Sequence, residues 1–120
     1  MAERNEKGKL GEDLAKEYLV NQGYEFLYAN WRTGKYEVDI IAKKDNILIF
    51  CEVKYRSSNF FGEPESFVST QKQKNVIRAA TSYVGKNCWE GENRFDIISV
   101  LETGGNVTIN HIENAYGCTW

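Results

Sequence analysis

The stretch ILIFCEVKYR, residues 47–56, begins as apolar as any buried strand and then contains Glu52 and Lys54. Side chains in a strand alternate between the two faces of a sheet, so Glu52 and Lys54 point one way and Val53 points the other. Charged side chains are seldom buried unless they are paired. The sequence therefore predicts a hydrophobic strand that carries an acid and a base on one face, which requires a physical reason.

The hydrophobic pattern around this strand predicts two helices and four further strands. Apolar residues at helical spacing indicate the helices, and alternation between turn residues indicates the strands. The segment 57–69 has the Gly, Pro and Ser content of a loop. Helices are expected over 6–21 and 70–86, and strands over 24–32, 36–44, 47–56, 93–102 and 106–113.

The order of these elements is α-β-β-β-α-β-β. Short turns make the first three strands an antiparallel meander, and the helix that follows can return the chain in parallel. The expected fold is therefore α/β (α+β), a mixed sheet flanked by helices, in a single domain over residues 1–120.

The composition predicts a folded cytoplasmic protein. Hydrophobic residues make up 42% of the 120 residues and charged residues 27%, which argues against a disordered chain. Three cysteines without a CxxC or Cys/His cluster fit a reducing compartment and do not predict a structural zinc site. The N-terminus is charged and lacks the apolar segment of a signal peptide, and no apolar run is long enough to cross a membrane.

The charge balance limits the kinds of partner that we expect. A net charge of −2 argues against a protein that coats DNA non-specifically, but it permits a local basic patch or a metal-assisted phosphate site. Arg56 and the basic residues of the second helix, Lys72, Lys74 and Arg78, are candidates to follow a phosphate backbone. The alternative is an ordinary solvated helix face.

A second acid lies in the strand expected over 36–44. Alternation places Glu37, Asp39 and Ile41 on one face, and the short Asp-Asn turn makes this strand the neighbour of the next. Asp39 can then approach Glu52 across the ladder, where the Cβ atoms of neighbours lie roughly 5 Å apart. Two carboxylates at that distance repel each other unless a proton, a lysine or a cation lies between them.

Lys54 is one answer to this repulsion, and a divalent cation held by Asp39 and Glu52 is another. Carboxylate oxygens favour Mg²⁺ or Mn²⁺, and such ions engage phosphates. A metal held there can activate water while Lys54 stabilises developing negative charge. The alternatives are a buried structural ion pair and a charged face on an exposed strand.

The helices contribute two further candidates. In the first helix the apolar stripe runs from Leu10 to Leu19, with Gly11 near its middle, where a missing side chain lets the helix approach the sheet closely. Glu12 lies at the edge of that stripe and either reaches the metal site or is solvated. Gln73 shares the inward face of the second helix and either orients a phosphate or water or makes a helix-end hydrogen bond.

Several residues have weaker claims. Phe60 and Phe61 in the loop can stack on bases or cover the core. His111, the one histidine, has no catalytic partner in the pattern and is expected to be structural or on the surface. Arg94 and Asp96 alternate onto one strand face and are expected to pair with each other.

Ordered motifs over nearly the whole chain, from Gly8 to Tyr116, resemble the YraN family. This bacterial group is uncharacterised, is regarded as endonuclease-like and is placed in the PD-(D/E)XK nuclease superfamily. The segments that carry the resemblance are GEDLAKEYLVNQGYEFLYANWR (11–32), YEVDIIAKKDNILIFCEVKYRS (36–57), FGEPESFVSTQKQ (61–73) and RFDIISV (94–100).

The resemblance implies roles for residues of this chain. Asp39 corresponds to the active-site aspartate of the superfamily, and Glu52 and Lys54 correspond to its (D/E)-x-K pair. Glu12 corresponds to the helical glutamate of junction-resolving nucleases, and Lys72-Gln73 match the family's Lys-Gln pair at the start of the second helix. Tyr36 replaces a glycine of the family pattern, a departure that concerns the turn or the entrance of the site.

The resemblance also implies a restriction-endonuclease-like fold and an activity. The activity is divalent-metal-dependent hydrolysis of DNA phosphodiester bonds, with branched or junction DNA as one substrate. Two alternatives stay open: a non-catalytic nucleic-acid-binding or adaptor module, and a purely structural network of the acids and Lys54. Paired cuts on two strands would be simplest for a homodimer.

Overall fold

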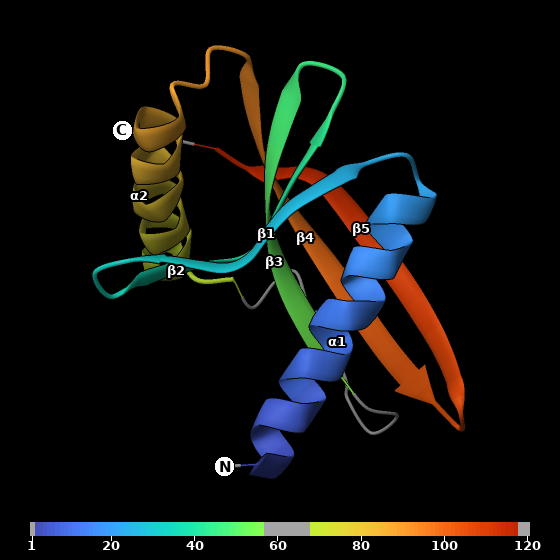
Figure 1. Ribbon diagram of the computed structural model, residues 1–120. Coiled ribbons are helices and arrows are strands. Elements are labelled where there is room, and N and C mark those ends of the chain that lie inside the picture. The colour runs from blue at the N-terminus through green and yellow to red at the C-terminus, as the bar shows by residue number, and fades with distance from the viewer. Residues whose placement is uncertain (1, 57–67, 118–120) are drawn as a thin grey trace.

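The computed structural model (Figure 1) contains all seven expected elements in the expected order. It describes residues 2–56 and 68–117, with side chains from residue 10 onward. The predicted mixed α/β fold is confirmed. The elements are α1 (Ala2–Asn21), β1 (Glu25–Thr33), β2 (Tyr36–Lys44), β3 (Ile47–Arg56), α2 (Thr70–Asn87), β4 (Glu92–Thr103) and β5 (Asn106–Tyr116).

The five strands form one sheet in the order β1-β2-β3-β4-β5, with β3 in the centre. Neighbouring strands are antiparallel except β3 and β4, which are parallel because α2 carries the chain back across the sheet. In the parallel register Glu52 lies opposite Ile97 and Lys54 lies opposite Ser99. The strand that carries Glu52 and Lys54 therefore lies in the middle of the sheet.

Each face of the sheet carries one helix and one core. Ala15 and Leu19 of α1 pack on one face, and Val76, Ala79 and Ala80 of α2 pack on the other. Because both faces are covered, β3 is apolar on both sides over its first half. The α1 face comprises Ile40, Ala42, Ile49, Cys51, Ile98 and Val100, and the α2 face comprises Val38, Ile41, Leu48 and Phe50.

The contact between α1 and the sheet confirms one prediction and corrects another. A Cβ atom on Gly11 would lie 3.1 Å from Cβ of Tyr55, so the missing side chain does allow a close approach. Leu10, which we expected on the apolar stripe, is 46% exposed. The buried row is Gly11, Ala15 and Leu19, and a residue next to such a row points about 100° away from it.

The strand β2 departs from β3 at Asp39. The pairing of the two strands ends at Ile40 opposite Cys51. Beyond that point the β1–β2 hairpin turns away toward α2, while β3 continues beside β4 (Figure 1). The Asp39 carboxylate accepts a 2.9 Å hydrogen bond from the Val53 N–H and so takes the place of a backbone acceptor.

This departure makes one prediction wrong. Alternation was expected to place Glu37, Asp39 and Ile41 together, but Val38 and Ile41 both pack on the α2 face. The alternation is broken between them, at Asp39. In β1, Ala29 pairs with Ile40 and Trp31 pairs with Val38. Asn30, which lies between them, has a left-handed φ of 54°.

Other outcomes concern the limits of the elements. The last strand runs to Tyr116, three residues beyond its predicted end at Glu113. Cys51 is fully buried, and burial raises the pKa of its thiol, as expected of a small core residue. The predictions for Phe60 and Phe61 lie outside the described residues. No helix over 2–56 and 68–117 is long and apolar enough to cross a membrane.

Candidate active site

Glu52 and Lys54 lie on one face of the sheet, as the alternation predicted, and the structure shows that this is the α2 face. Phe50 belongs to the core under α2, and Cys51 and Val53 pack on the opposite side. Glu52 is 6% exposed, and it is the first charged residue of β3. The end of the apolar run is therefore also the point where β2 leaves β3.

Two lysines hold the Glu52 carboxylate. Nζ of Lys54 lies 3.4 Å from Oε2, and Nζ of Lys72 lies 3.6 Å from Oε1. Lys72 comes from the first turn of α2, whose start is fixed by Ser69, because the Ser69 hydroxyl accepts a hydrogen bond from the Lys72 N–H at 3.1 Å. The predicted pairing of Glu52 with Lys54 is present, and α2 adds a second cation to it.

Asp39 is much less well satisfied. Its carboxylate accepts the Val53 N–H, while Lys72 acts on it through its charge alone. Burial, followed by repulsion from Glu52, raises the pKa of Asp39 from an ordinary value of 3.8 to about 7. Near neutral pH this carboxyl is thus divided between its charged and neutral forms, and a further positive charge would favour the charged form.

Glu12 approaches the same cluster from α1. Nδ2 of Asn30 donates a 2.9 Å hydrogen bond to its Oε1. Burial raises the pKa of Glu12, and the charges of Glu37, Asp13 and Glu52 raise it further. Asn30 lies in the left-handed position of β1 described above, so the irregularity of the β1–β2 hairpin helps to position both Glu12 and Asp39.

The residues of this site fit a Mg²⁺ or Mn²⁺ ion better than a zinc ion. No group of three His, Cys, Asp or Glu side chains able to hold a metal occurs within the described parts of the chain. Mg²⁺ is commonly held by one or two carboxylates, with water and substrate phosphate completing its ligands, and two carboxylates are what Asp39 and Glu52 supply. Structural zinc needs four protein ligands, mostly Cys and His.

The other predicted site residues are placed around this cluster or away from it. Nε2 of Gln73 donates to the Val68 carbonyl at 3.2 Å, which is the helix-end hydrogen bond that the sequence allowed. Nη1 of Arg78 donates to the Tyr36 hydroxyl at 2.8 Å, and Nη1 of Arg56 donates to the Tyr55 carbonyl. Lys74 is partly buried on α2. Of the four basic residues predicted to contact a phosphate backbone, Lys72 is the one whose described contacts include the carboxylates of the site.

Two hydroxyl groups on the same face were not predicted from the sequence. Ser99 of β4 lies opposite Lys54 in the parallel register, and Tyr116 ends β5. Tyr116 is not predictable as a site residue because the alternating pattern of the last strand ends at Glu113. One feature of the sequence could have indicated Ser99. It lies between the apolar residues Ile98 and Val100, which pack on the α1 face, so alternation directs its side chain to the α2 face.

A second polar cluster is centred on Asp96, on the α1 face. Asp96 accepts hydrogen bonds from Nε and Nη2 of Arg94, lies 2.7 Å from Nε2 of His111, and accepts the Asn114 N–H. Nδ1 of His111 lies 3.1 Å from the Tyr18 hydroxyl. The predicted pairing of Arg94 with Asp96 is confirmed, and His111, for which we found no partner in the sequence, is part of the same cluster.

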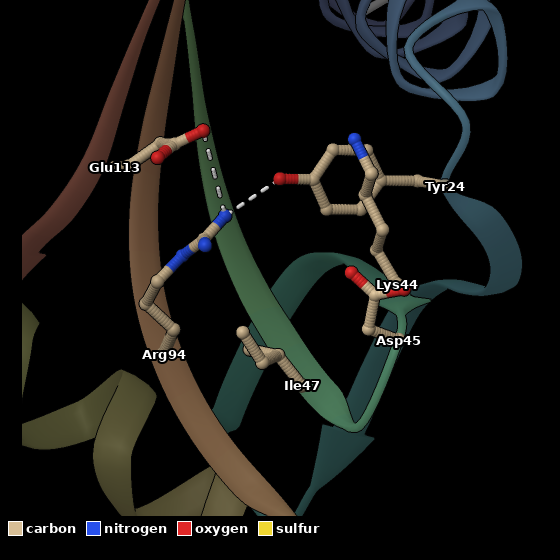
Figure 2. A pocket seen from close by; sticks show the side chains of 6 residues that line it. All are labelled: Tyr24, Lys44, Asp45, Ile47, Arg94 and Glu113. Atoms are coloured by element: carbon tan, nitrogen blue, oxygen red, sulfur yellow. Dashed lines mark hydrogen bonds and ion pairs between the residues drawn. The ribbon is translucent and has the colours of Figure 1, made fainter.

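A pocket of about 190 Å³ lies beside this second cluster (Figure 2). Arg94 contacts the Tyr24 hydroxyl at 2.7 Å and Oε2 of Glu113 at 3.9 Å across it. Lys44, Asp45 and Ile47 complete the lining, so the pocket lies at the start of β3 and away from Glu52. Its two cationic side chains face two carboxylates, which leaves no excess charge of either sign.

Comparisons with known proteins identify the family of this chain. The family model described as uncharacterised protein family UPF0102 matches residues 11–100. This chain belongs to the UPF0102 family. The predicted resemblance to the YraN family is confirmed, because UPF0102 is that family. The match includes Glu12, Asp39, Glu52, Lys54 and the whole of α2.

UPF0102 proteins of several bacteria are similar over nearly their whole length. The chain is 47% identical over 116 residues to one of Flavobacterium psychrophilum, covering 97% of this chain and 98% of the relative. It is 45% identical to one of Bacteroides thetaiotaomicron, covering 97% and 96% of the two chains. A relative of Christiangramia forsetii is 46% identical, with 97% and 98% covered.

Proposed function

We propose that this UPF0102 protein is a divalent-metal-dependent endonuclease that hydrolyses DNA phosphodiester bonds, with branched or junction DNA as one substrate. The observation that carries the proposal is the pair of Asp39 and Glu52 where β2 leaves β3. Repulsion from Glu52 contributes to the raised pKa of Asp39, and the contacts of Asp39 leave its charge only partly balanced. Buried carboxylates with displaced pKa values are typical of catalytic sites.

In this proposal Asp39 and Glu52 ligate Mg²⁺ or Mn²⁺. The bound ion supplies Lewis acidity toward a phosphate oxygen and lowers the pKa of water. Asp39 contributes its charged form, whose share grows as the pH rises through the raised pKa of about 7. The rigid central strand fixes Glu52, so the ion position is set by the sheet and does not depend on a loop.

Lys54 stabilises negative charge on the phosphate during hydrolysis. Its ammonium group is mostly buried beside Glu52, where a charge interacts more strongly than it does in water. A lysine on the same strand face as a metal-binding glutamate can hold the phosphate or the attacking water without a change in the backbone. In the proposal Lys54 exchanges part of its contact with Glu52 for a contact with the substrate.

The remaining residues orient the reactants and hold the DNA. Glu12, which Asn30 orients, holds a proton or a water molecule beside the carboxylates, and burial raises the pKa of its carboxyl and so favours the form that carries a proton. Gln73 orients a phosphate or water from the first turn of α2. Lys72, Lys74, Arg78 and Arg56 contact the DNA backbone, and a homodimer would place two such sites on two strands.

The direct test is cleavage of a panel of linear, nicked, flapped and four-way-junction DNAs with Mn²⁺ or Mg²⁺. We expect the wild type to cut at least one of these DNAs, and we expect Lys54→Ala and Glu52→Gln to reduce cleavage by 100-fold or more, on the order of the loss of one charge-stabilising group. Lys86→Ala is the matched control, because it removes the same charge from a position outside the proposed site. Lys86 lies in the last turn of α2, over the ring of Trp31. Equal cleavage by all four proteins would exclude this site as its source.

A non-catalytic nucleic-acid-binding or adaptor module is the second candidate function. It is favoured by the two ion pairs of Glu52, which balance the charge of that carboxylate without a metal. This candidate predicts that the wild type shifts DNA in a gel but cuts none of the panel under any metal condition. Removal of Lys72 would then weaken binding, whereas Glu52→Gln would leave binding nearly unchanged.

A further inference from the structure

Two buried side-chain atoms in the described residues have no hydrogen-bond partner, and both lie on the face of the sheet that carries Glu52 and Lys54. They are the Ser99 and Tyr116 hydroxyl oxygens. Burying a hydroxyl without a partner costs free energy, and native proteins rarely retain such groups without a reason. Two of them beside one candidate site suggest that the site brings partners that the protein alone does not contain.

The position of Tyr116 is fixed by stacking on its neighbours. Its ring stacks on Phe95 at 5.5 Å between centroids, and Phe95 stacks on Phe50 at the same distance. These three rings follow one row across β5, β4 and β3, and Phe50 precedes Glu52 by two residues on the same strand face. The ring is therefore held rigidly, and its hydroxyl is buried on the side of the sheet where Glu52 lies.

Electrostatics agrees with this placement. Burial is the largest cause that raises the pKa of the Tyr116 hydroxyl, and the charge of Glu52 is the largest contribution from any carboxylate, ahead of Asp39 and Asp96. Tyr116 thus keeps its proton and can act as a donor. In the structure both Glu52 oxygens instead face the ammonium groups of Lys54 and Lys72, at 3.4 and 3.6 Å.

We propose that Tyr116 is a positioning residue of the site, whose buried hydroxyl donates a hydrogen bond to the Glu52 carboxylate when Glu52 ligates a divalent cation. The inference rests on the proposed function. Ligation would commit one oxygen of Glu52 to the cation and leave the other oxygen in need of a donor, because the lysine contacts at 3.4 and 3.6 Å are longer than ordinary hydrogen bonds. The stacked ring then offers a fixed donor for the other oxygen. Hydrogen bonds of this kind orient metal-binding carboxylates and increase their affinity.

Such a role predicts opposite effects of Tyr116→Phe on metal binding and on stability. The change removes the hydroxyl and keeps the ring, so the stacking on Phe95 is preserved. We expect the dissociation constant for Mn²⁺ to rise about 10-fold, the lower end for the loss of a group that orients a metal ligand. In EDTA the variant should melt at the same temperature as the wild type or up to about 4 °C higher, since an unpaired buried hydroxyl is removed.

The matched control is Tyr83→Phe. Tyr83 packs against Phe50 from α2, with its ring centroid 6.1 Å away, and burial alone raises the pKa of its hydroxyl. Tyr83→Phe therefore removes a hydroxyl group from the same aromatic cluster, at a position away from the carboxylates. We expect this variant to bind Mn²⁺ with unchanged affinity. Titration calorimetry with MnCl₂ and melting in EDTA, on the full chain, measure both quantities.

The results separate this inference from the proposed function. If the wild type binds Mn²⁺ and Tyr116→Phe binds it equally well, or if that variant melts at a lower temperature in EDTA, the inference is wrong and the proposed metal site stands. If the wild type binds no Mn²⁺, both are wrong. The role of Tyr116 is supported if Tyr116→Phe binds Mn²⁺ more weakly at unchanged or higher stability, while Tyr83→Phe binds Mn²⁺ as the wild type does.

Discussion

Asp96 is fully buried and Asp39 is partly buried within one sheet, and their pKa values move in opposite directions. Burial raises the pKa of both carboxyls. At Asp96 the hydrogen bonds from His111, Arg94 and Asn114 more than offset burial, and the net pKa is lowered. At Asp39 the Val53 N–H and the Lys72 charge do not offset burial and Glu52, and the pKa rises to about 7.

The difference shows which cluster is complete. Asp96 is 0% exposed, and its donors come from β4 and β5, so it joins two strands and needs nothing more. Asp39 lies where two strands part, beside a second acid, with fewer donors than its charge requires. A locally unfavourable arrangement of this kind is expected where function requires it, whereas a fully satisfied buried network serves the fold.

The largest expected effect of a substitution is at the complete cluster. Asp96→Asn should lower the free energy of unfolding by about 3 kcal/mol, because it leaves the Arg94 guanidinium partly buried without its carboxylate. Urea denaturation at pH 8 in EDTA measures this loss. A change smaller than about 1 kcal/mol would mean that the cluster does not stabilise the sheet as its hydrogen bonds suggest.

The same substitution at the incomplete cluster should act in the other direction. Asp39→Asn keeps an oxygen for the Val53 N–H and removes the charge that Glu52 repels. At pH 8 without metal we expect the free energy of unfolding to rise by about 1 kcal/mol, a little less than one pKa unit of relief. A loss of stability like that of Asp96→Asn would remove the contrast between the two aspartates.

The dependence of stability on pH should distinguish the clusters further. The pKa of Asp39 is raised. Its contribution to the free energy of unfolding is therefore complete below pH 3.8, the ordinary pKa of an aspartate, and is lost as the pH rises through about 7. The pKa of Asp96 is lowered, so its contribution is present above 3.8 and is lost as the pH falls below that value. In EDTA the wild type should lose stability between pH 5 and pH 8.

Asp39→Asn is the control for this pH profile, because it should flatten the decline between pH 5 and pH 8 while the loss at acid pH remains. Urea denaturation at five pH values is sufficient to compare the two proteins. Identical slopes in the wild type and the variant over that interval would show that Asp39 titrates as an ordinary surface carboxyl.

The smallest expected effect concerns the support of Glu12. Asn30→Gly removes the hydrogen bond to Oε1 of Glu12 and tolerates the left-handed φ of 54° at this exposed position, so the free energy of unfolding should fall by about 0.5 to 1 kcal/mol. Cleavage should fall by several-fold if Glu12 serves the site. A matched change at another exposed asparagine with a left-handed φ of 54°, Asn114→Gly in β5, should leave both quantities nearly unchanged.

The sequence predicted those parts of the site that follow regular strand geometry. Glu52 and Lys54 share a face because β3 alternates without interruption, and Arg94 and Asp96 pair for the same reason in β4. The order of the elements and the parallel return through α2 also follow from local patterns and turn lengths.

The parts that failed depend on irregular backbone and on register. Asp39 breaks the alternation because its side chain takes a backbone acceptor's place, which no hydrophobic period encodes. His111 reaches Asp96 because the register of β4 and β5 shifts between Phe95 and Ile97. Tyr116 lies beyond Asn114, which has a left-handed φ of 54°. This irregular residue interrupts the alternation of the strand, so the sequence pattern did not predict that the strand continues to Tyr116.

The central claim is that Asp39 and Glu52 together bind a divalent cation, and titration calorimetry of the metal-free protein with Mn²⁺ at pH 7.5 tests it most directly. The account predicts binding by the wild type that is lost in both Asp39→Asn and Glu52→Gln and retained in Lys86→Ala. Absence of binding by the wild type, or binding that survives both substitutions, would contradict it.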